Sequence, residues 1–124
     1  MKNYLLVALG GLLGSVARYW MQGFVSDRAP SDFPYGTLLV NLLGCFLIGL
    51  FFALAQERNL ISPEWRILLT TGFCGGFTTF STFSFETLAL MREGNILYAG
   101  LYVGGSVVFG FAATYAGWAA GGAV

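Results

Sequence analysis

The sequence predicts an all-α membrane protein with four transmembrane helices in a single domain that covers residues 1–124. Of the 124 residues, 56% are apolar and only 10% are charged, and the mean hydropathy of +0.72 is far from that of a soluble domain. A helix needs about 20 apolar residues to cross the hydrocarbon core of a bilayer. A chain of this length therefore accommodates four crossings with short connections and leaves no room for a separate soluble domain.

Charged and turn-forming residues divide the chain into apolar segments. The connections are expected at residues 26–34 (SDRAPSDFP), 57–64 (ERNLISPE) and 92–95 (REGN). The spans are then expected at about residues 4–25, 35–56, 65–91 and 96–122. At 1.5 Å per residue, each span is about 33 Å or longer, which is enough to cross a bilayer with some tilt.

The composition argues against several classes of function. The chain has no His, which removes the usual general base and the commonest metal ligand. Six Lys and Arg residues balance six Asp and Glu residues, so no basic patch for nucleic acid is expected. Cys45 and Cys74 lie in apolar segments and form no CxxC pair, so we interpret them as packing residues. An enzyme is not expected, because no nucleophile, base and orienting residue can be combined.

Lys and Arg are spread evenly over the two sides of the predicted helices. One side carries Lys2, Arg58 and Arg66, and the other carries Arg28 and Arg92, with Arg18 within reach of it. Cytoplasmic loops usually hold an excess of these residues. Without that excess, the chain is expected to insert in both orientations and to pair as an antiparallel homodimer. A weak bias that still selects one orientation is the alternative.

The third apolar segment has an unusual centre. Gly72, Gly75 and Gly76 precede the run TTFSTFS at residues 78–84, which holds five hydroxyls and two phenyl rings. Glycines at this depth favour a break in the helix, and a break leaves backbone groups that lipid cannot satisfy. We therefore expect the third helix to be broken at mid-membrane, near Gly75–Thr78. A hydroxyl that bonds to its own helix explains any single Thr or Ser, but not five together.

On a helix, these side chains form two neighbouring stripes. One stripe contains Thr79, Thr82 and Glu86, and the other contains Phe80, Phe83, Ser84 and Thr87. Hydroxyls beside rings fit the lining of an ion pathway, although core packing of the two phenylalanines also explains their spacing. The available donors are hydroxyls, the Asn41 amide and the positive edges of the rings, so the lining is neutral and leaves the sign of the ion open.

Three strings of the sequence resemble the Fluc/CrcB family of fluoride channels. They are GGLLGSVARY (Gly10–Tyr19), GTLLVNLLGCFLIG (Gly36–Gly49) and GFCGGFTTFSTFSFE (Gly72–Glu86). The resemblance implies an antiparallel homodimer with a broken third helix, two fluoride pathways and a structural sodium ion at the dimer centre. It also implies passive exit of fluoride through the bacterial inner membrane, down its electrochemical gradient, which reduces fluoride toxicity.

The resemblance assigns roles to individual residues. The fluoride pathway is expected to include Asn41, Phe80, Ser81, Thr82, Phe83, Ser84, Tyr102 and Ser106. The backbone carbonyls of Gly75 and Thr78 are expected to hold the sodium ion. Arg18 and Glu86 match charged positions of the family motifs, and the sequence does not decide whether they steer ions or anchor helices.

Two other classes of protein fit a chain with four spans. A small multidrug-type dual-topology exporter has about this length, but its coupling chemistry needs an acid in the first span, and none lies between Tyr4 and Val25. A noncatalytic membrane assembly protein would tolerate apolar replacements of the polar residues in the third span. Fluoride suits the neutral lining, because several donors must replace its water without holding the ion too firmly.

Overall fold

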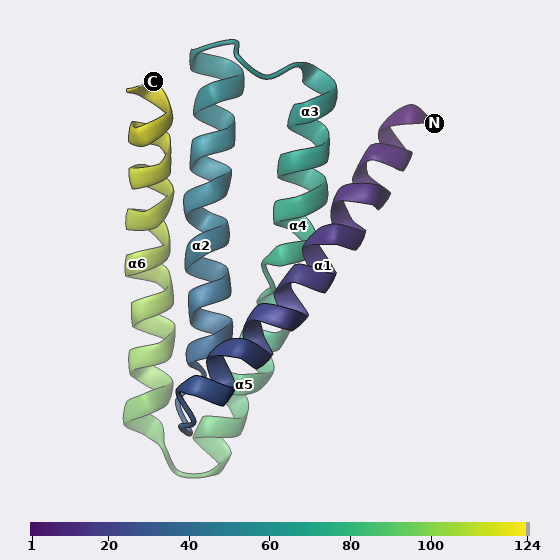
Figure 1. Ribbon diagram of the computed structural model, residues 1–124. Helices are drawn as coiled ribbons and strands as arrows, with labels where there is room; N and C mark the ends of the chain where they lie inside the picture. The colour runs from purple at the N-terminus through teal and green to yellow at the C-terminus, as the bar shows by residue number, and fades with distance from the viewer. Residues whose placement is uncertain (124) are drawn as a thin grey trace.

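The computed structural model describes residues 1–123, and every regular element in that range is helical (Figure 1). In chain order the elements are α1 (Lys2–Arg28), α2 (Tyr35–Phe52), the π-helical η1 (Ala53–Glu57), α3 (Pro63–Ile67), the π-helical η2 (Leu68–Cys74), α4 (Gly75–Phe77), α5 (Phe80–Arg92) and α6 (Ile96–Gly122). The all-α prediction is therefore confirmed for these residues.

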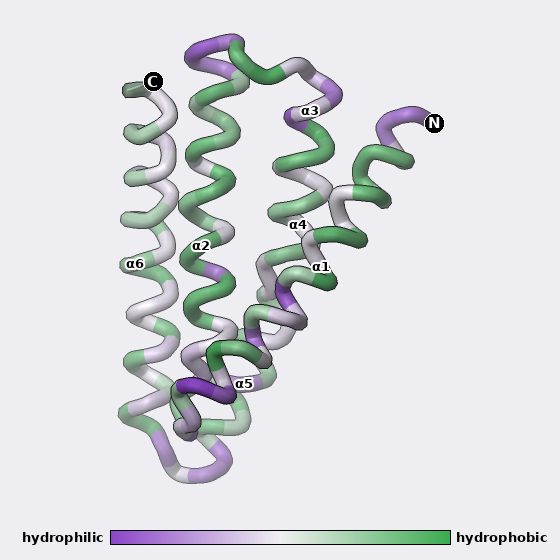
Figure 2. The backbone as a smooth tube through the Cα atoms, in the orientation of Figure 1, coloured by the Kyte–Doolittle hydropathy of each residue, from purple (hydrophilic) through white to green (hydrophobic). Residues whose placement is uncertain are grey.

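The membrane assignment follows from length, composition and exposure. Three helical stretches are long and apolar enough to cross a bilayer, namely Lys2–Arg28, Tyr35–Glu57 and Ile96–Gly122. Figure 2 shows hydrophobic residues along α2 and α6 and hydrophilic residues gathered at the connections. Large apolar side chains such as Leu12, Phe109 and Phe111 are exposed. Contiguous apolar surface of this extent is typical of a protein that is covered by lipid or by another chain.

The segment that contains the expected third span is helical at both ends and interrupted in the middle. Thr78 (φ −89°, ψ 159°) and Thr79 (φ −149°, ψ 122°) have extended backbones between α4 and α5. The expected break is present, but it does not lie at the glycines, since Gly75 keeps a helical backbone (φ −61°, ψ −38°). Thr79 ends the interruption, because its hydroxyl accepts a hydrogen bond from the Thr82 amide (3.2 Å) and caps the first turn of α5.

Glycines let α1 lie directly on the backbone of η2 and α4. A Cβ atom at Gly10 would lie 2.8 Å from the Phe73 nitrogen and 2.9 Å from the Gly72 Cα. A Cβ atom at Gly76 would lie 2.7 Å from the Gly11 carbonyl oxygen. Such spacing admits only hydrogen at these positions, which is the close approach that small residues provide between membrane helices. As a result, α1 crosses the interrupted segment close to its break (Figure 1).

The pair formed by α2 and α6 packs in the same way. A Cβ atom at Gly49 would overlap the Thr114 carbonyl oxygen, and one at Gly117 would overlap the Phe46 carbonyl oxygen. The two helices run side by side along the length of the molecule (Figure 1). Backbone contact on both helices fixes their spacing, so α2 and α6 form a rigid wall beside the interrupted segment.

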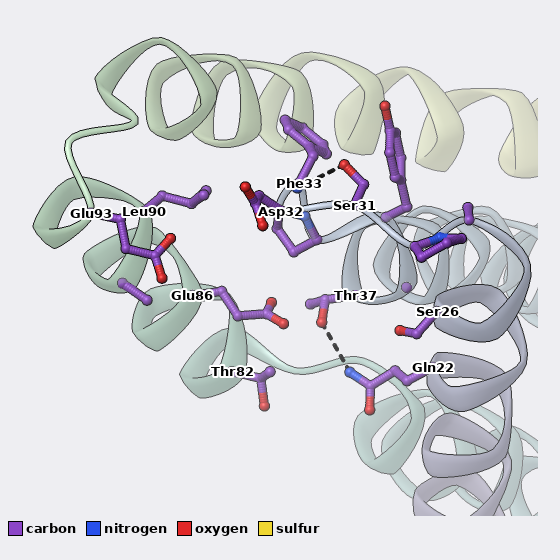
Figure 3. A pocket seen from close by; sticks show the side chains of 16 residues that line it. Gln22, Ser26, Ser31, Asp32, Phe33, Thr37, Thr82, Glu86, Leu90 and Glu93 are labelled. Atoms are coloured by element: carbon purple, nitrogen blue, oxygen red, sulfur yellow. Dashed lines mark hydrogen bonds between the residues drawn. The ribbon is translucent and has the colours of Figure 1, made fainter.

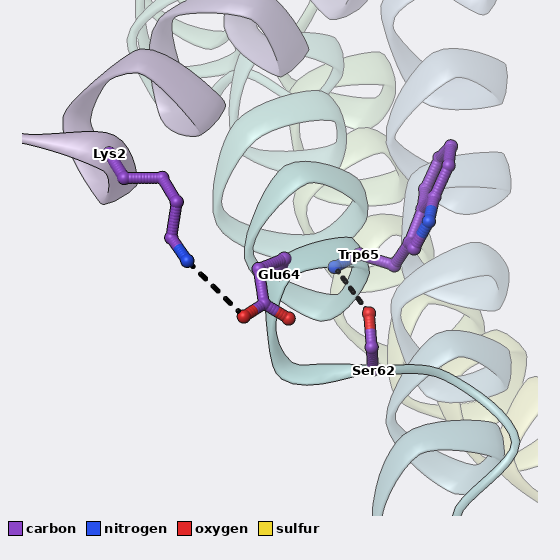
Figure 4. A network of polar contacts seen from close by, with 4 residues as sticks. All are labelled: Lys2, Ser62, Glu64 and Trp65. Carbon is purple, nitrogen blue, oxygen red and sulfur yellow. Dashed lines mark hydrogen bonds and ion pairs between the residues drawn. The ribbon is translucent and has the colours of Figure 1, made fainter.

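Contacts at one end of the molecule join the N-terminus to the second connection. The Ser62 hydroxyl caps α3 by accepting a hydrogen bond from the Trp65 amide (3.3 Å), and Lys2 Nζ lies 3.4 Å from Glu64 Oε1 (Figure 4). A hydrogen bond from its own backbone amide, together with Lys2, lowers the pKa of the Glu64 carboxyl. The exposed ion pair adds little stability, but it shows that Lys2 and the 57–64 connection lie at the same end, as the charge count assumes.

We predict that Gly117→Ala destabilises the protein, whereas Gly122→Ala on the same helix does not. The added methyl at position 117 would overlap the α2 backbone, while nothing lies within 4 Å of a Cβ atom at position 122. Overpacking of this kind costs roughly 1–3 kcal/mol. Thermal unfolding of the purified protein in detergent measures the difference. Equal melting temperatures for the two variants would contradict the backbone contact.

Candidate functional site

A groove at the level of the break gathers residues from α2, from both sides of the interruption and from α6. Among the residues expected from the sequence, its lining includes Asn41, Gly75, Thr78, Phe80, Phe83 and Ser106. These residues are distant in the sequence, and the packing of α2 against α6 brings them together. The groove is open to one side and has a volume of about 640 Å³.

The break frees the two carbonyl groups that are expected to bind sodium. In a continuous helix each amide donates to the carbonyl four residues earlier. The Thr79 amide instead donates to Asn41 Oδ1 (2.8 Å), and the Thr82 amide donates to Thr79 Oγ1 (3.2 Å). The carbonyls of Gly75 and Thr78 therefore lose their helical donors. Neutral backbone oxygens of this kind suit a small monovalent cation, so the chemistry of these residues fits sodium.

Asn41 holds the extended backbone of Thr79 at two points. Its Oδ1 accepts from the Thr79 amide at 2.8 Å, and its Nδ2 donates to the Thr79 carbonyl at 3.1 Å. The arrangement resembles the paired bonds that a neighbouring β-strand would supply. One amide hydrogen of Nδ2 is still available after this contact. Asn41 is thus joined to the break and also lines the groove.

Arg18 makes a second contact with the break, from α1. Its Nε donates to the carbonyl of Gly76 at 3.0 Å, and the side chain is partly buried. In a continuous helix the Phe80 amide would occupy that carbonyl. Of the two roles that the sequence leaves open for Arg18, this contact is an anchoring one.

The two phenylalanines differ in their surroundings. Their ring centroids are 5.7 Å apart. The Phe80 side chain is 79% exposed, so core packing does not explain its position in this chain. Phe83 is partly buried and packs against Tyr102, with ring centroids 4.9 Å apart. One ring is therefore fixed by the chain itself, and the other extends from α5 without a neighbouring helix.

A second pocket, of about 670 Å³, lies between α1, α5 and the 29–34 connection (Figure 3). Thr82 and Glu86, both singled out by the sequence, line it, and so do Gln22, Ser26, Asp32, Thr37 and Glu93. Gln22 Nε2 donates to Thr37 Oγ1 at 3.0 Å and joins α1 to α2. The lining of the pocket mixes apolar residues with three carboxylates, those of Asp32, Glu86 and Glu93.

Tyr102 connects the groove with this pocket. The residue is fully buried, its ring packs on Phe83, and its hydroxyl donates to Glu86 Oε1 at 2.9 Å. Tyr102 thus joins α6 to α5 by direct contacts. Ser106 lies one turn further along α6, and its buried Oγ finds no hydrogen-bond partner within residues 1–123.

Three expected pathway residues, Tyr102, Ser81 and Ser84, line neither cavity. Ser81 and Ser84 are exposed on α5, and Ser81 Oγ lies 3.4 Å from Thr79 Oγ1. No local sequence signal indicates the contacts of Arg18 and Asn41 with the break, because each joins residues that are far apart in the chain. A local signal for the position of the break was present, since threonine is a favoured N-cap residue and Thr79 directly precedes α5.

Comparison with known proteins places the chain in a family. The family model described as "CrcB-like protein, Camphor Resistance (CrcB)" matches residues 5–118. A relative from Chlorobaculum tepidum, named "Fluoride-specific ion channel FluC", is 56% identical over 117 residues, which are 94% of this chain and 92% of the relative.

Two further relatives carry the same name. The protein from Chlorobium chlorochromatii is 53% identical over 124 residues, with 96% of this chain and 95% of the relative covered. The protein from Nitratidesulfovibrio vulgaris is 45% identical over 121 residues, with 98% of both chains covered. With a family match over nearly its whole length and relatives of this similarity, the chain belongs to the CrcB family.

Proposed function

We propose that this protein is a fluoride-selective ion channel that lets cytoplasmic fluoride leave the cell passively and so reduces fluoride toxicity. The observation that carries the proposal is the groove at the break, where the Phe80 and Phe83 rings, the Asn41 amide and the Ser106 hydroxyl meet. The name of the relatives supports the choice of ion. Membership of an ion-channel family also means that the protein is not an enzyme.

The chemistry of the groove suits a small anion. The edge of a phenyl ring is positive, and amide and hydroxyl hydrogens are donors. The buried Ser106 hydroxyl has no partner within the described residues, so no other protein group there uses its donor. Because every one of these groups is neutral, they replace the water of fluoride without binding the ion firmly. An inside-negative potential favours exit of an anion by about 2.3 kcal/mol per 100 mV, so no coupled energy source is needed.

A second copy of the chain completes the pathway in this proposal. A water molecule takes up about 30 Å³ of liquid, so an open groove of about 640 Å³ admits many waters and cannot strip a hydration shell. A second chain that covers the exposed Phe80 ring would narrow the path. The even distribution of Lys and Arg supports insertion in both orientations and therefore an antiparallel homodimer.

In the proposed dimer each chain crosses the bacterial inner membrane four times. The apolar stretches Lys2–Arg28, Tyr35–Glu57 and Ile96–Gly122 account for three crossings, and the interrupted segment from α3 to α5 accounts for the other. The described chain ends lie at the same end of the molecule, which supports an even number of crossings (Figure 1). Thr82 lines the second pocket, and Tyr102 adjoins that pocket through its hydrogen bond to Glu86. Ser81 and Ser84 add hydroxyls along α5.

The carbonyls of Gly75 and Thr78 would hold a sodium ion at the dimer centre. When bound, the ion supplies a positive charge that compensates carbonyl dipoles without helical donors. Antiparallel pairing would bring two such sets of carbonyls together. This arrangement would satisfy backbone groups that otherwise cost several kcal/mol each inside a membrane.

Fluoride efflux from liposomes tests the proposed function. Purified protein is reconstituted into liposomes that contain either fluoride or chloride, and an ion-selective electrode records release. We expect rapid release of fluoride and retention of chloride, because the narrow neutral pathway admits only a small anion. Retention of both ions, or release of both at equal rates, would contradict fluoride selectivity.

In the same assay, Phe80→Ile and Phe83→Ile should each lower the rate of fluoride release at least tenfold while the dimer still forms. Isoleucine has similar bulk but no positive ring edge. Phe85→Ile is the matched control, since Phe85 lies on the same helix, is 70% exposed and does not line the groove. If Phe80→Ile and Phe83→Ile both release fluoride at the rate of the parent protein, the proposed role of the rings is wrong.

Insertion in both orientations is tested by cysteine labelling. In a variant with Cys45 and Cys74 replaced by serine, a single cysteine is appended to the C-terminus and intact cells are treated with an impermeant thiol reagent. We expect a mixture of labelled and unlabelled chains, because Lys and Arg give no preferred orientation. Labelling of all chains, or of none, would rule out the antiparallel dimer.

A further inference from the structure

We infer that Arg18 and Asn41 are positioning residues that hold the break at Thr78–Thr79 and thereby determine which carbonyls are free to bind a cation. The identity of that cation as sodium rests on the proposed function. The inference concerns the contacts of Arg18 and Asn41 with backbone atoms, not a direct contact with fluoride.

The contacts divide the backbone groups of the break into two sets. Where one helix ends and another begins, carbonyls before the break and amides after it lose their partners. Arg18 Nε donates to the Gly76 carbonyl. Asn41 accepts from the Thr79 amide and donates to the Thr79 carbonyl. The Thr82 amide is taken by the Thr79 side chain. These contacts leave the carbonyls of Gly75, Phe77 and Thr78 without one of these partners, and those of Gly75 and Thr78 are the two proposed to bind a cation.

Each of the two side chains has a glycine beside it on its own helix. Gly14 lies one turn before Arg18, and a Cβ atom there would lie 3.0 Å from the Phe77 nitrogen. Gly44 lies one turn after Asn41, and a Cβ atom there would overlap the Thr78 side chain. Residues three or four apart share a helix face. The faces of α1 and α2 that carry Arg18 and Asn41 are therefore packed against the break, which fixes where the two side chains act.

For Arg18, a positioning role and a role for its charge predict different outcomes for the same two substitutions. The Nε atom of arginine and the Nε2 atom of glutamine are the same number of bonds from the backbone. Glutamine therefore offers a neutral N–H donor at the place from which Arg18 reaches Gly76. Lysine keeps the charge, but its donor lies one bond further out. If Arg18 positions the break, Arg18→Gln should preserve its role better than Arg18→Lys does. If Arg18 instead supplies charge, Arg18→Lys should preserve that role better.

For Asn41, the two halves of the contact can be separated. Asn41→Asp keeps an oxygen acceptor for the Thr79 amide and loses the donor to the Thr79 carbonyl. Asn41→Leu loses both. The matched control is Gln22→Leu, which removes the hydrogen bond between Gln22 and Thr37 one turn further along α1 without touching the break.

The experiment is thermal unfolding of the purified protein in detergent, in solutions where sodium replaces N-methylglucamine at constant ionic strength. The parent protein should be stabilised by sodium with a measurable half-maximal concentration. Arg18→Leu and Asn41→Leu should raise that concentration by about tenfold to a hundredfold, the range typical when a residue that orients metal ligands is lost. Arg18→Gln should stay closer to the parent than Arg18→Lys does, and Asn41→Asp should lie between the parent and Asn41→Leu.

The control separates positioning from general stability. Gln22→Leu should lower the melting temperature equally with and without sodium and leave the half-maximal concentration unchanged. The inference is overturned if Arg18→Lys keeps the parent's sodium dependence and Arg18→Gln does not, or if the Leu variants at positions 18 and 41 behave like the control. It is also overturned if sodium does not stabilise the parent. Fluoride efflux is not part of this readout, so a parent that is stabilised by sodium but passes no fluoride would refute the proposed function alone.

Discussion

Within a membrane, each backbone amide or carbonyl that loses its helical partner must find another inside the protein, since lipid offers none. The interruption at Thr78–Thr79 creates several such groups in a chain that is apolar over most of its length. Some of these groups find partners around the break. The Thr79 side chain caps α5, and side chains from α1 and α2 bond to the backbone of Gly76 and Thr79. Among the groups that these contacts leave unsatisfied are the carbonyls of Gly75 and Thr78, which the proposed sodium ion would bind.

The glycines are a consequence of the same constraint. Arg18 and Asn41 reach backbone atoms only if their helices lie against the interrupted segment, and larger residues at Gly14 and Gly44 would hold the helices apart. The same close packing between α2 and α6 brings Ser106 and Asn41 into the lining of one groove. The polar groups of the site are thus positioned by contacts between small residues, while the apolar side chains face outward to lipid or to a second chain.

Much of the fold followed from the sequence. Composition and turn residues predicted the helical class, the start of α2 and both ends of α6, because charged and turn-forming residues mark the connections. The break was expected near Gly75–Thr78 from the glycines, and it lies at the end of that range, at Thr78–Thr79, while α4 keeps Gly75–Phe77 helical. The glycines serve close packing, and Thr79 forms the cap. The contacts of Arg18 with Gly76 and of Asn41 with Thr79 are tertiary, so no local pattern could predict them. The π-helical turns of η1 and η2 had no local signal either.

The measurement that tests the broken segment most directly is the set of ¹³Cα and ¹³Cβ chemical shifts for residues 74–84 of the protein in lipid nanodiscs. The structure predicts helical shifts for Gly75–Phe77 and from Phe80 onward, with extended shifts at Thr78 and Thr79. Helical shifts that continue without interruption through Thr78 and Thr79 would contradict the break. The free carbonyls and the roles given to Arg18 and Asn41 would then have no structural basis.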